Sequence, residues 1–183
     1  MMKIYNQDNC AELLARGGFE DEKLVAAVKE IVSDVKKKGD AALFAYAKKF
    51  DNTDLTAETI AVSPAEIEAA YAAVDKELLA SLRLAVKNIL AYHSRNVMQD
   101  DVRSDGQGRT TGYVVRAVER AGIYVPGGTA PLFSSVCMGI LPAKAAGVEH
   151  IYVATPAKEG KVSPATIVAG AECGAGEIFK VGG

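Results

Sequence analysis

The chain has 183 residues and a mass of 19.2 kDa, with 49% hydrophobic and 24% charged side chains, the composition of an ordinary soluble globular protein. Its 21 basic and 23 acidic side chains give a formal net charge of −2, which excludes the polybasic field that nucleic acid or an anionic lipid surface would need. The sequence also lacks an apolar run near the roughly 20 residues of a membrane helix and the apolar core of a secretion signal. Its three cysteines are widely spaced, so we expect free thiols, a reducing compartment and a cytoplasmic location.

Two helices are predicted near the start of the chain. Apolar side chains recur at helical spacing over residues 24–35, and the stripe ends at three lysines and Gly39. Asp40 is then expected to cap a second helix. The predicted inward positions of that second helix are Leu43, Ala47 and Phe50.

Two further helices are predicted before a polar boundary. Residues 63–66 read Ser-Pro-Ala-Glu, a capping box with proline at the first helical position, and this combination marks a helix start. The longer helix that follows would turn five side chains inward: Leu78, Leu82, Val86, Ile89 and His93. We place a hinge or boundary in the polar, glycine-containing stretch 99–112. Residues 1–112 are thus expected to be a helical segment, the first part of a larger α/β domain.

Residues 113–183 have a different character, because eleven of the 17 glycines and only eight charged side chains lie after residue 120. Short apolar runs at 122–125, 150–154 and 177–181 predict strands buried on both faces. Helices are expected between them, at about 134–146 and from Ser163-Pro164 to about Cys173. Two right-handed crossovers then make a parallel βαβαβ unit, a Rossmann-like segment that begins a second domain.

A ligand crevice is expected at the carboxyl ends of these strands. The first strand ends in Tyr124 and a loop containing Pro126 and Gly127, before a helix whose first amides could hold an anion such as a pyrophosphate. The loop is not GxGxxG, and no acidic residue closes the second strand, so an ordinary tight turn before a capped helix remains the alternative. Tyr124 could stack on a ligand ring or pack beneath the neighbouring crossover, and the residues alone favour packing.

No catalytic residue or metal ligand is predicted in this chain. His93 lies on an apolar stripe and is expected in the core, and Glu149-His150 opens a strand at the edge opposite the crevice. HExxH, paired cysteines, a carboxylate cluster, GxSxG and a P-loop are all absent from the sequence.

Long segments resemble histidinol dehydrogenase. They are ERAGIYVPGGTAPLFSSVCMGILPAKAAGVEHIYVATPA and AGAECGAGEIFKVGG, preceded in consistent order by KKKGDAALFAYAKKFD, SPAEIEAAYAAV and LRLAVKNILAYHSRN. The resemblance begins at about residue 20. It implies oxidation of L-histidinol to L-histidine through the aldehyde, the last step of histidine biosynthesis, by a homodimer that uses two NAD and a zinc ion. In this family the zinc orients the substrate alcohol, and a glutamate–histidine pair moves protons.

The chain departs from the family in length, since family members are more than twice as long. The resemblance therefore assigns the zinc ligands, the catalytic glutamate–histidine pair and most substrate contacts to polypeptide outside this sequence. The YVPGG motif carries the family's cofactor-binding tyrosine onto Tyr124, with Pro126 and Gly127 beside it. We expect a fragment that does not turn over alone and that exposes apolar surface on a half-built first domain. The alternative is a non-catalytic nucleotide-binding or interaction module with a half-Rossmann fold.

Overall fold

The computed structural model describes residues 4–7, 10–11, 22–127 and 132–182. The chain divides into two compact units, residues 1–42 and residues 43–183. Within the described ranges, no helix is both long enough and apolar enough to cross a membrane.

The first unit contains α2 (Glu22–Lys38), which confirms the predicted helix. Gly39, with φ of 60°, follows its last residue, and its amide donates to the Val35 carbonyl at 2.9 Å. None of the side chains of α2 is buried, and Leu24 is 61% exposed. The apolar spacing therefore predicted the helix correctly, although none of its side chains is fully buried in the described part of the chain.

The helix α3 (Asp40–Asp51) includes Asp40 as its first residue. Ala47 is buried as expected, but the inward position predicted for Phe50 is wrong, because its side chain is largely exposed. The Phe50 ring lies parallel to the ring of Tyr46, with centroids 5.7 Å apart. An aromatic pair on the helix surface thus replaces the expected core contact.

The two helices that follow agree closely with the sequence. At α4 (Pro64–Ala73) the Ser63 hydroxyl accepts from the Glu66 amide, and the Glu66 carboxylate accepts from the Ser63 amide, so the predicted capping box is present. The next helix, α5 (Lys76–Ser94), is capped by Asp75 and buries Leu82.

A parallel sheet in the order β3-β4-β5 forms the centre of the second unit. Its strands are β3 (Arg120–Tyr124), β4 (His150–Ala154) and β5 (Glu177–Phe179), joined through α6 (Phe133–Ala145) and α7 (Pro164–Cys173). Tyr124 pairs with Ala154, which pairs with Phe179, so the strands end in register. This arrangement confirms the predicted βαβαβ unit.

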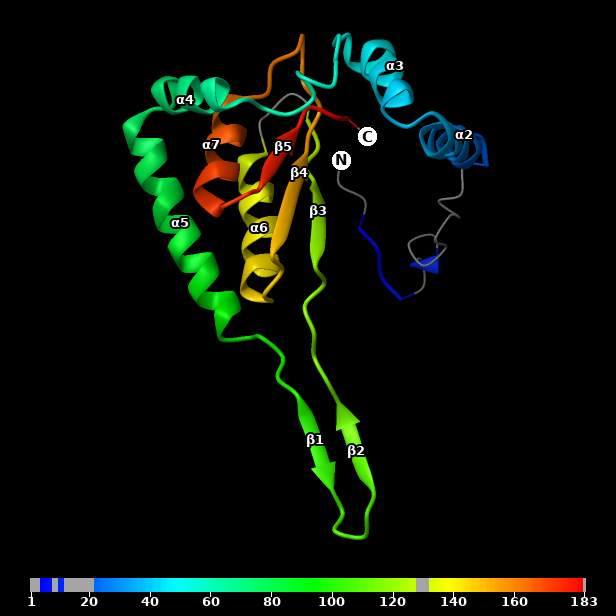
Figure 1. Ribbon diagram of the computed structural model, residues 1–183, viewed down its shortest axis with the longest axis vertical. Coiled ribbons are helices and arrows are strands. Elements are labelled where there is room, and N and C mark those ends of the chain that lie inside the picture. Colours follow the sequence, from blue (N-terminus) through cyan, green and yellow to red (C-terminus); the bar gives the residue numbers. More distant parts are fainter. Residues whose placement is uncertain (1–3, 8–9, 12–21, 128–131, 183) are drawn as a thin grey trace. The chain divides into compact units, whose positions relative to one another are not determined.

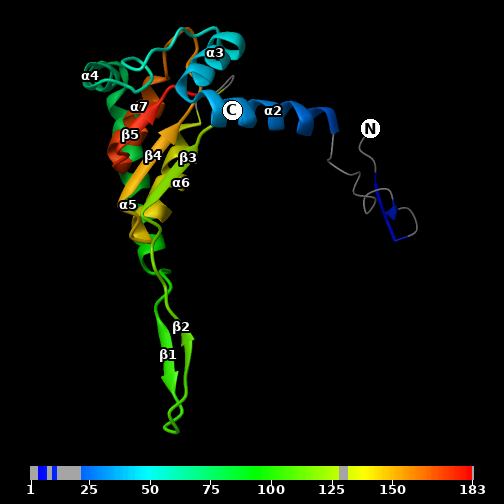
Figure 2. The ribbon, with the colours of Figure 1, turned by 45° about the vertical axis from the view of Figure 1, so that its right-hand side comes forward.

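Helices cover one face of this sheet (Figures 1 and 2). There α6 and α7 pack against the strands, and α4 and α5 pack on the outer side of α6 and α7. The core lies between these layers, where Val136, Ile140, Leu141, Val153 and Val168 are fully buried. The other face keeps Tyr124, Tyr152 and Phe179 only partly covered. The expectation of strands buried on both faces is therefore wrong for this chain, in which the described helices of the second unit cover one.

An antiparallel hairpin occupies the stretch where the sequence predicted a hinge or boundary. It consists of β1 (Asp101–Ser104) and β2 (Thr110–Tyr113), and the Asp105 carboxylate accepts from the amides of Gln107 and Arg109 in the turn. Seven of the eight strand residues are exposed, so the hairpin has no buried face that would give an apolar alternation in the sequence. The division into domains at residue 112 stays a prediction.

Candidate functional site

The carboxyl ends of the three parallel strands meet at one edge of the sheet. Beyond the strands, the Val125 amide donates to the Ala154 carbonyl at 2.9 Å, and the Thr155 amide donates to the Phe179 carbonyl at 3.0 Å. The first residues of the loops that follow β3, β4 and β5 therefore lie side by side. In an open parallel sheet this edge is where ligands bind.

Tyr124 is half exposed at this edge. Its side chain keeps 52% of its accessible surface, whereas the next residue, Val125, is 1% exposed. A tyrosine packed beneath the neighbouring crossover would be buried, whereas the ring of Tyr124 is half exposed in this chain, and its stacking on a ligand stays a prediction.

Pro126 and Gly127 line a pocket of about 150 Å³ beside this tyrosine's strand. The remaining lining residues come from the loop after β4 and from the start of α7: Thr155, Pro156, Lys158, Lys161, Val162, Ser163 and Thr166, with Leu132 from the residue before α6. A Cβ atom at Gly127 would lie 2.5 Å from Cγ of Pro156. The loops thus approach so closely that only glycine fits at this wall of the pocket.

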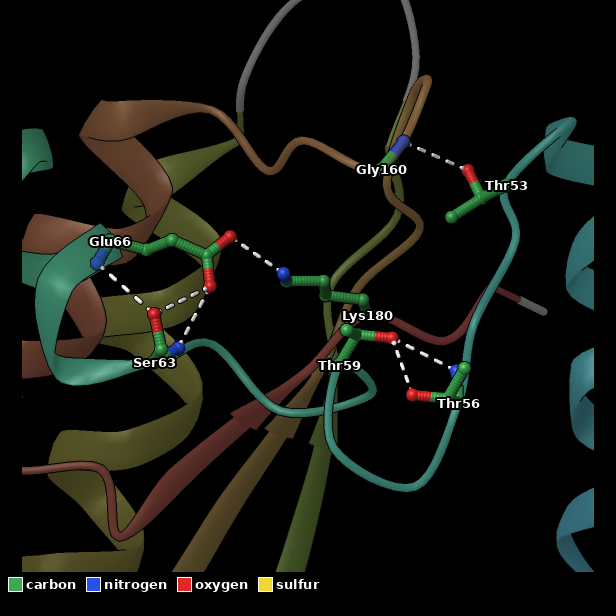
Figure 3. Close-up of polar contacts among 7 residues, drawn as sticks. All are labelled: Thr53, Thr56, Thr59, Ser63, Glu66, Gly160 and Lys180. Atoms are coloured by element: carbon green, nitrogen blue, oxygen red, sulfur yellow. Dashed lines mark hydrogen bonds and ion pairs between the residues drawn. The ribbon is translucent and has the colours of Figure 1, made fainter.

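The loop after β4 is held by a buried threonine from the segment after α3 (Figure 3). The Thr53 hydroxyl donates to the Ala157 carbonyl at 2.8 Å and accepts from the Gly160 amide at 3.2 Å. Thr53 itself is 1% exposed. The loop that carries Lys158 and Lys161 is therefore fixed just before its turn and within it.

A partly buried ion pair holds the segment after β5 (Figure 3). Lys180 is 6% exposed, and its Nζ lies 2.6 Å from Oε1 of Glu66, whose other carboxylate oxygen belongs to the capping box of α4. Burial raises the pKa of Glu66, but hydrogen bonds from Lys180 and Ser63 outweigh it and hold that pKa below its ordinary value. The Lys180 amide also donates to the Ile60 carbonyl, so Lys180 is tied both to α4 and to the chain before it.

The histidines and cysteines take no part in this edge. His93 is half-buried on α5 and His150 is exposed at the start of β4, at the opposite end of the sheet. Cys137 and Cys173 are buried in the core as free thiols, as expected.

Comparison with known proteins identifies the family of this chain. The family model described as histidinol dehydrogenase matches residues 14–183. The chain belongs to the histidinol dehydrogenase family. The histidinol dehydrogenase of Agrobacterium fabrum is 43% identical over 162 residues, which cover 88% of this chain and 38% of that protein. That of Methanocaldococcus jannaschii is 42% identical over 184 residues, covering 100% of this chain and 42% of that protein.

A solved structure agrees with this assignment. The crystal structure of histidinol dehydrogenase from Elizabethkingia anophelis matches with a TM-score of 0.87 at 35% identity, over 98% of this chain and 41% of that chain. The chain thus spans about two fifths of the length of the histidinol dehydrogenases that it matches.

The zinc ion that the resemblance implies has no set of ligands in the described part of this chain. Within residues 4–7, 10–11, 22–127 and 132–182, no three His, Cys, Asp or Glu side chains gather where a metal ion could be held. The described residues therefore do not fit a zinc site. The family resemblance assigns the ligands to polypeptide outside this sequence.

Sequence reasoning missed most of the pocket. The structure brings Pro126 and Gly127 into its wall, as a loop site predicts, but Tyr124 is not among the lining residues. Lys158 and Lys161 after β4 were not singled out, although they flank a Glu-Gly pair that predicts a tight turn. That turn follows a strand that ends at the edge where ligands are expected, and this combination could have predicted the two lysines as pocket residues.

Proposed function

We propose that the protein to which this chain belongs is an NAD- and zinc-dependent histidinol dehydrogenase. It oxidises L-histidinol to L-histidine through the aldehyde, as a cytoplasmic homodimer in histidine biosynthesis. The observation that carries this proposal is the family match over residues 14–183, which includes the half-exposed tyrosine of YVPGG. Residues 113–183 begin the nucleotide-binding domain, and residues 1–112 begin the domain before it.

In this proposal the chain contributes part of the cofactor site. NAD, when bound, accepts the hydride that leaves the substrate carbon. Tyr124 offers its open aromatic surface to a ring of the cofactor. Pro126 and Gly127 form part of the pocket wall, where the absence of a side chain at Gly127 lets the loops after β3 and β4 pack closely together.

The chemical steps are assigned to the rest of the family's chain. The described residues offer no zinc ligand set, and the edge of the sheet holds no histidine that could move a proton at the substrate. We therefore expect the 183 residues alone to be inactive, with NAD affinity weakened because one aromatic contact rarely secures a dinucleotide.

The test uses the full-length protein and three variants, Tyr124→Ala, Tyr124→Phe and Tyr113→Ala. Loss of a stacking ring worth about 1–1.5 kcal/mol raises the KM for NAD about tenfold in Tyr124→Ala. Tyr124→Phe keeps the ring and stays near the parent value. Tyr113, a tyrosine of matched exposure on the hairpin, is the control and leaves the KM unchanged.

Two results would count against the proposal, and they are distinct. A full-length protein that does not oxidise histidinol with NAD refutes the activity and favours a non-catalytic binding module. An unchanged KM for NAD in Tyr124→Ala refutes only the role of Tyr124.

A further inference from the structure

The pocket beside Gly127 contains two buried hydroxyls without partners. Thr155 and Thr166 are 3% and 4% exposed, and in the part of the chain that the structure describes neither side chain makes a hydrogen bond. Within the same part, no solvent-inaccessible side-chain oxygen lacks a partner. Each of these two hydroxyl oxygens must therefore keep a small opening to solvent, and both residues line the pocket. The pocket thus presents buried hydrogen-bonding groups that a ligand would satisfy.

Two lysines face the same pocket from a tight turn. The amides of Lys158 and Lys161 each donate to the other's carbonyl at 3.0 Å, with Glu159 and Gly160 at positive φ between them. Side chains of such a directly opposed pair lie on one face of the turn, and here both line the pocket. Glu159 is not among the lining residues.

These lysines form a local excess of positive charge. Among the described residues neither has an ion-pair partner, whereas Lys38, Lys48 and Lys180 each have one. Like charges directly opposite each other destabilise a strand pair, so an anion between them would remove that cost. The positive end of α7 adds to the same field, because Ser163 precedes it without a side-chain cap and lines the pocket.

We propose that this pocket binds a phosphate group. Hydroxyls from Thr155, Ser163 and Thr166 would donate to its oxygens, and the ammonium groups of Lys158 and Lys161 would balance its charge. A volume of about 150 Å³ is smaller than the roughly 300–1,000 Å³ of pockets that enclose whole drug-sized ligands, so it suits one group rather than a whole nucleotide. The site is also preorganised, since Thr53 holds the turn at residues 158–161 in place.

This proposal goes beyond the dehydrogenase assignment. It is tested with inorganic phosphate alone, without substrate or cofactor. The full-length protein, freed of phosphate and sulfate, is titrated with inorganic phosphate by isothermal titration calorimetry and by ³¹P NMR line broadening. The pocket variants are the double substitution Lys158→Ala/Lys161→Ala and the near-isosteric Thr166→Val. The control is Lys36→Ala/Lys37→Ala, which removes the same charge from exposed positions on α2.

We expect saturable phosphate binding that weakens at least tenfold in the double pocket variant and about three- to tenfold in Thr166→Val. The control variant binds as the parent does. Absence of saturable binding, or an equal loss in the control, overturns the proposal. Thr166→Val keeps the test valid if the double variant folds poorly, and circular dichroism checks each variant.

A competition arm identifies the source of the phosphate. Displacement of bound phosphate by NAD supports a pocket that holds one phosphate of the dinucleotide. Phosphate that stays bound at saturating NAD supports a site for free phosphate or for a separate phosphate monoester. Because the probe is inorganic phosphate, failure here leaves the histidinol activity untouched, and failure of that activity leaves this site untouched.

Discussion

Thr53 and Thr166 are both buried, but their hydroxyls differ in what they bond. The Thr53 hydroxyl joins Ala157 and Gly160, whereas that of Thr166 makes no hydrogen bond in the described part of the chain. We therefore expect Thr166→Val to change the free energy of unfolding by less than about 1 kcal/mol, because it removes no hydrogen bond within the protein and the hydroxyl oxygen keeps a small opening to solvent. Thr53→Val should lower it by about 1–3 kcal/mol, because two backbone groups lose their partner.

Urea denaturation of the two threonine variants, in buffer without phosphate, measures this difference. Equal destabilisation by both would mean that the Thr166 hydroxyl has a hydrogen-bond partner in the protein. Unchanged stability combined with weaker phosphate binding would instead show that this hydroxyl serves the ligand and not the fold.

Single residues were predictable from the sequence where their partners are local. The Ser63–Glu66 capping box spans three residues, so the sequence contains both halves of the interaction. Lys180 was not singled out, because its partner Glu66 lies 114 residues earlier and only tertiary packing joins them. The sequence alone did not decide whether Tyr124 stacks on a ligand or packs in the core, since a sequence does not show whether the second face of a sheet is covered.

The ion pair between Lys180, which follows β5, and Glu66 of α4 makes the attachment of these elements sensitive to pH. The pKa of Glu66 is held below its ordinary value of 4.5, so folding favours the ionised carboxylate. Its contribution is complete above the unfolded pKa and is lost as the pH falls through the lower folded pKa. Glu66→Gln should therefore flatten the acid side of a plot of unfolding free energy against pH.

The same variant leaves Lys180 buried without its partner at neutral pH. Removal of one member of a buried pair costs about 3–5 kcal/mol, and we expect about 2 kcal/mol because the Glu66 side chain is 36% exposed. Glu68→Gln, the neighbouring carboxylate on α4, is the control and should change neither stability nor its pH dependence. Denaturant melts at pH 3 to 7 give both quantities, and parallel curves for Glu66→Gln and the parent would refute the pairing.

The contact of α6 with β3 depends on the absence of a side chain at Gly139. A Cβ atom there would overlap Cγ2 of Ile123, so Gly139→Ala should cost about 1–3 kcal/mol despite the higher helix propensity of alanine. Gly122→Ala, in β3 with nothing near its Cβ position, is the matched control and should be tolerated. In a double-mutant cycle, the cost of Gly139→Ala should shrink when Ile123→Ala is already present. Additive costs would show that the two residues do not touch.

Helices and strands were predicted correctly where apolar residues recur in a clear pattern. The strands and helices of the βαβαβ unit lie within a few residues of their predicted bounds, because apolar runs and turn residues alternate clearly. The β1–β2 hairpin was missed, since its strands are exposed and its pairing depends on a close backbone approach. A Cβ at Gly112 would overlap the Asp101 carbonyl oxygen, a requirement that no spacing in the sequence reveals.

At the scale of the whole molecule, each unit by itself leaves apolar surface without cover. In the first unit, Leu24, Val28 and Val32 on α2 are exposed. In the second, the open face of the sheet carries Tyr152 and Phe179, which are only partly buried. The chain spans about two fifths of the length of its relatives. We infer that the remaining polypeptide of a full-length family member covers these faces, since exposed patches of this kind mark contact surfaces.

The 183-residue polypeptide should therefore self-associate when it is produced alone. Its apparent mass by size-exclusion chromatography with light scattering should rise with concentration, and Val28→Lys should reduce that rise by placing a charge in the apolar stripe of α2. Lys29→Glu alters charge on the same helix without touching the stripe and is the control. A constant monomer mass across the concentration range would mean that these faces do not associate. The full-length protein should show one fixed mass instead, because its own chain occupies surfaces that copies of the shorter polypeptide would share.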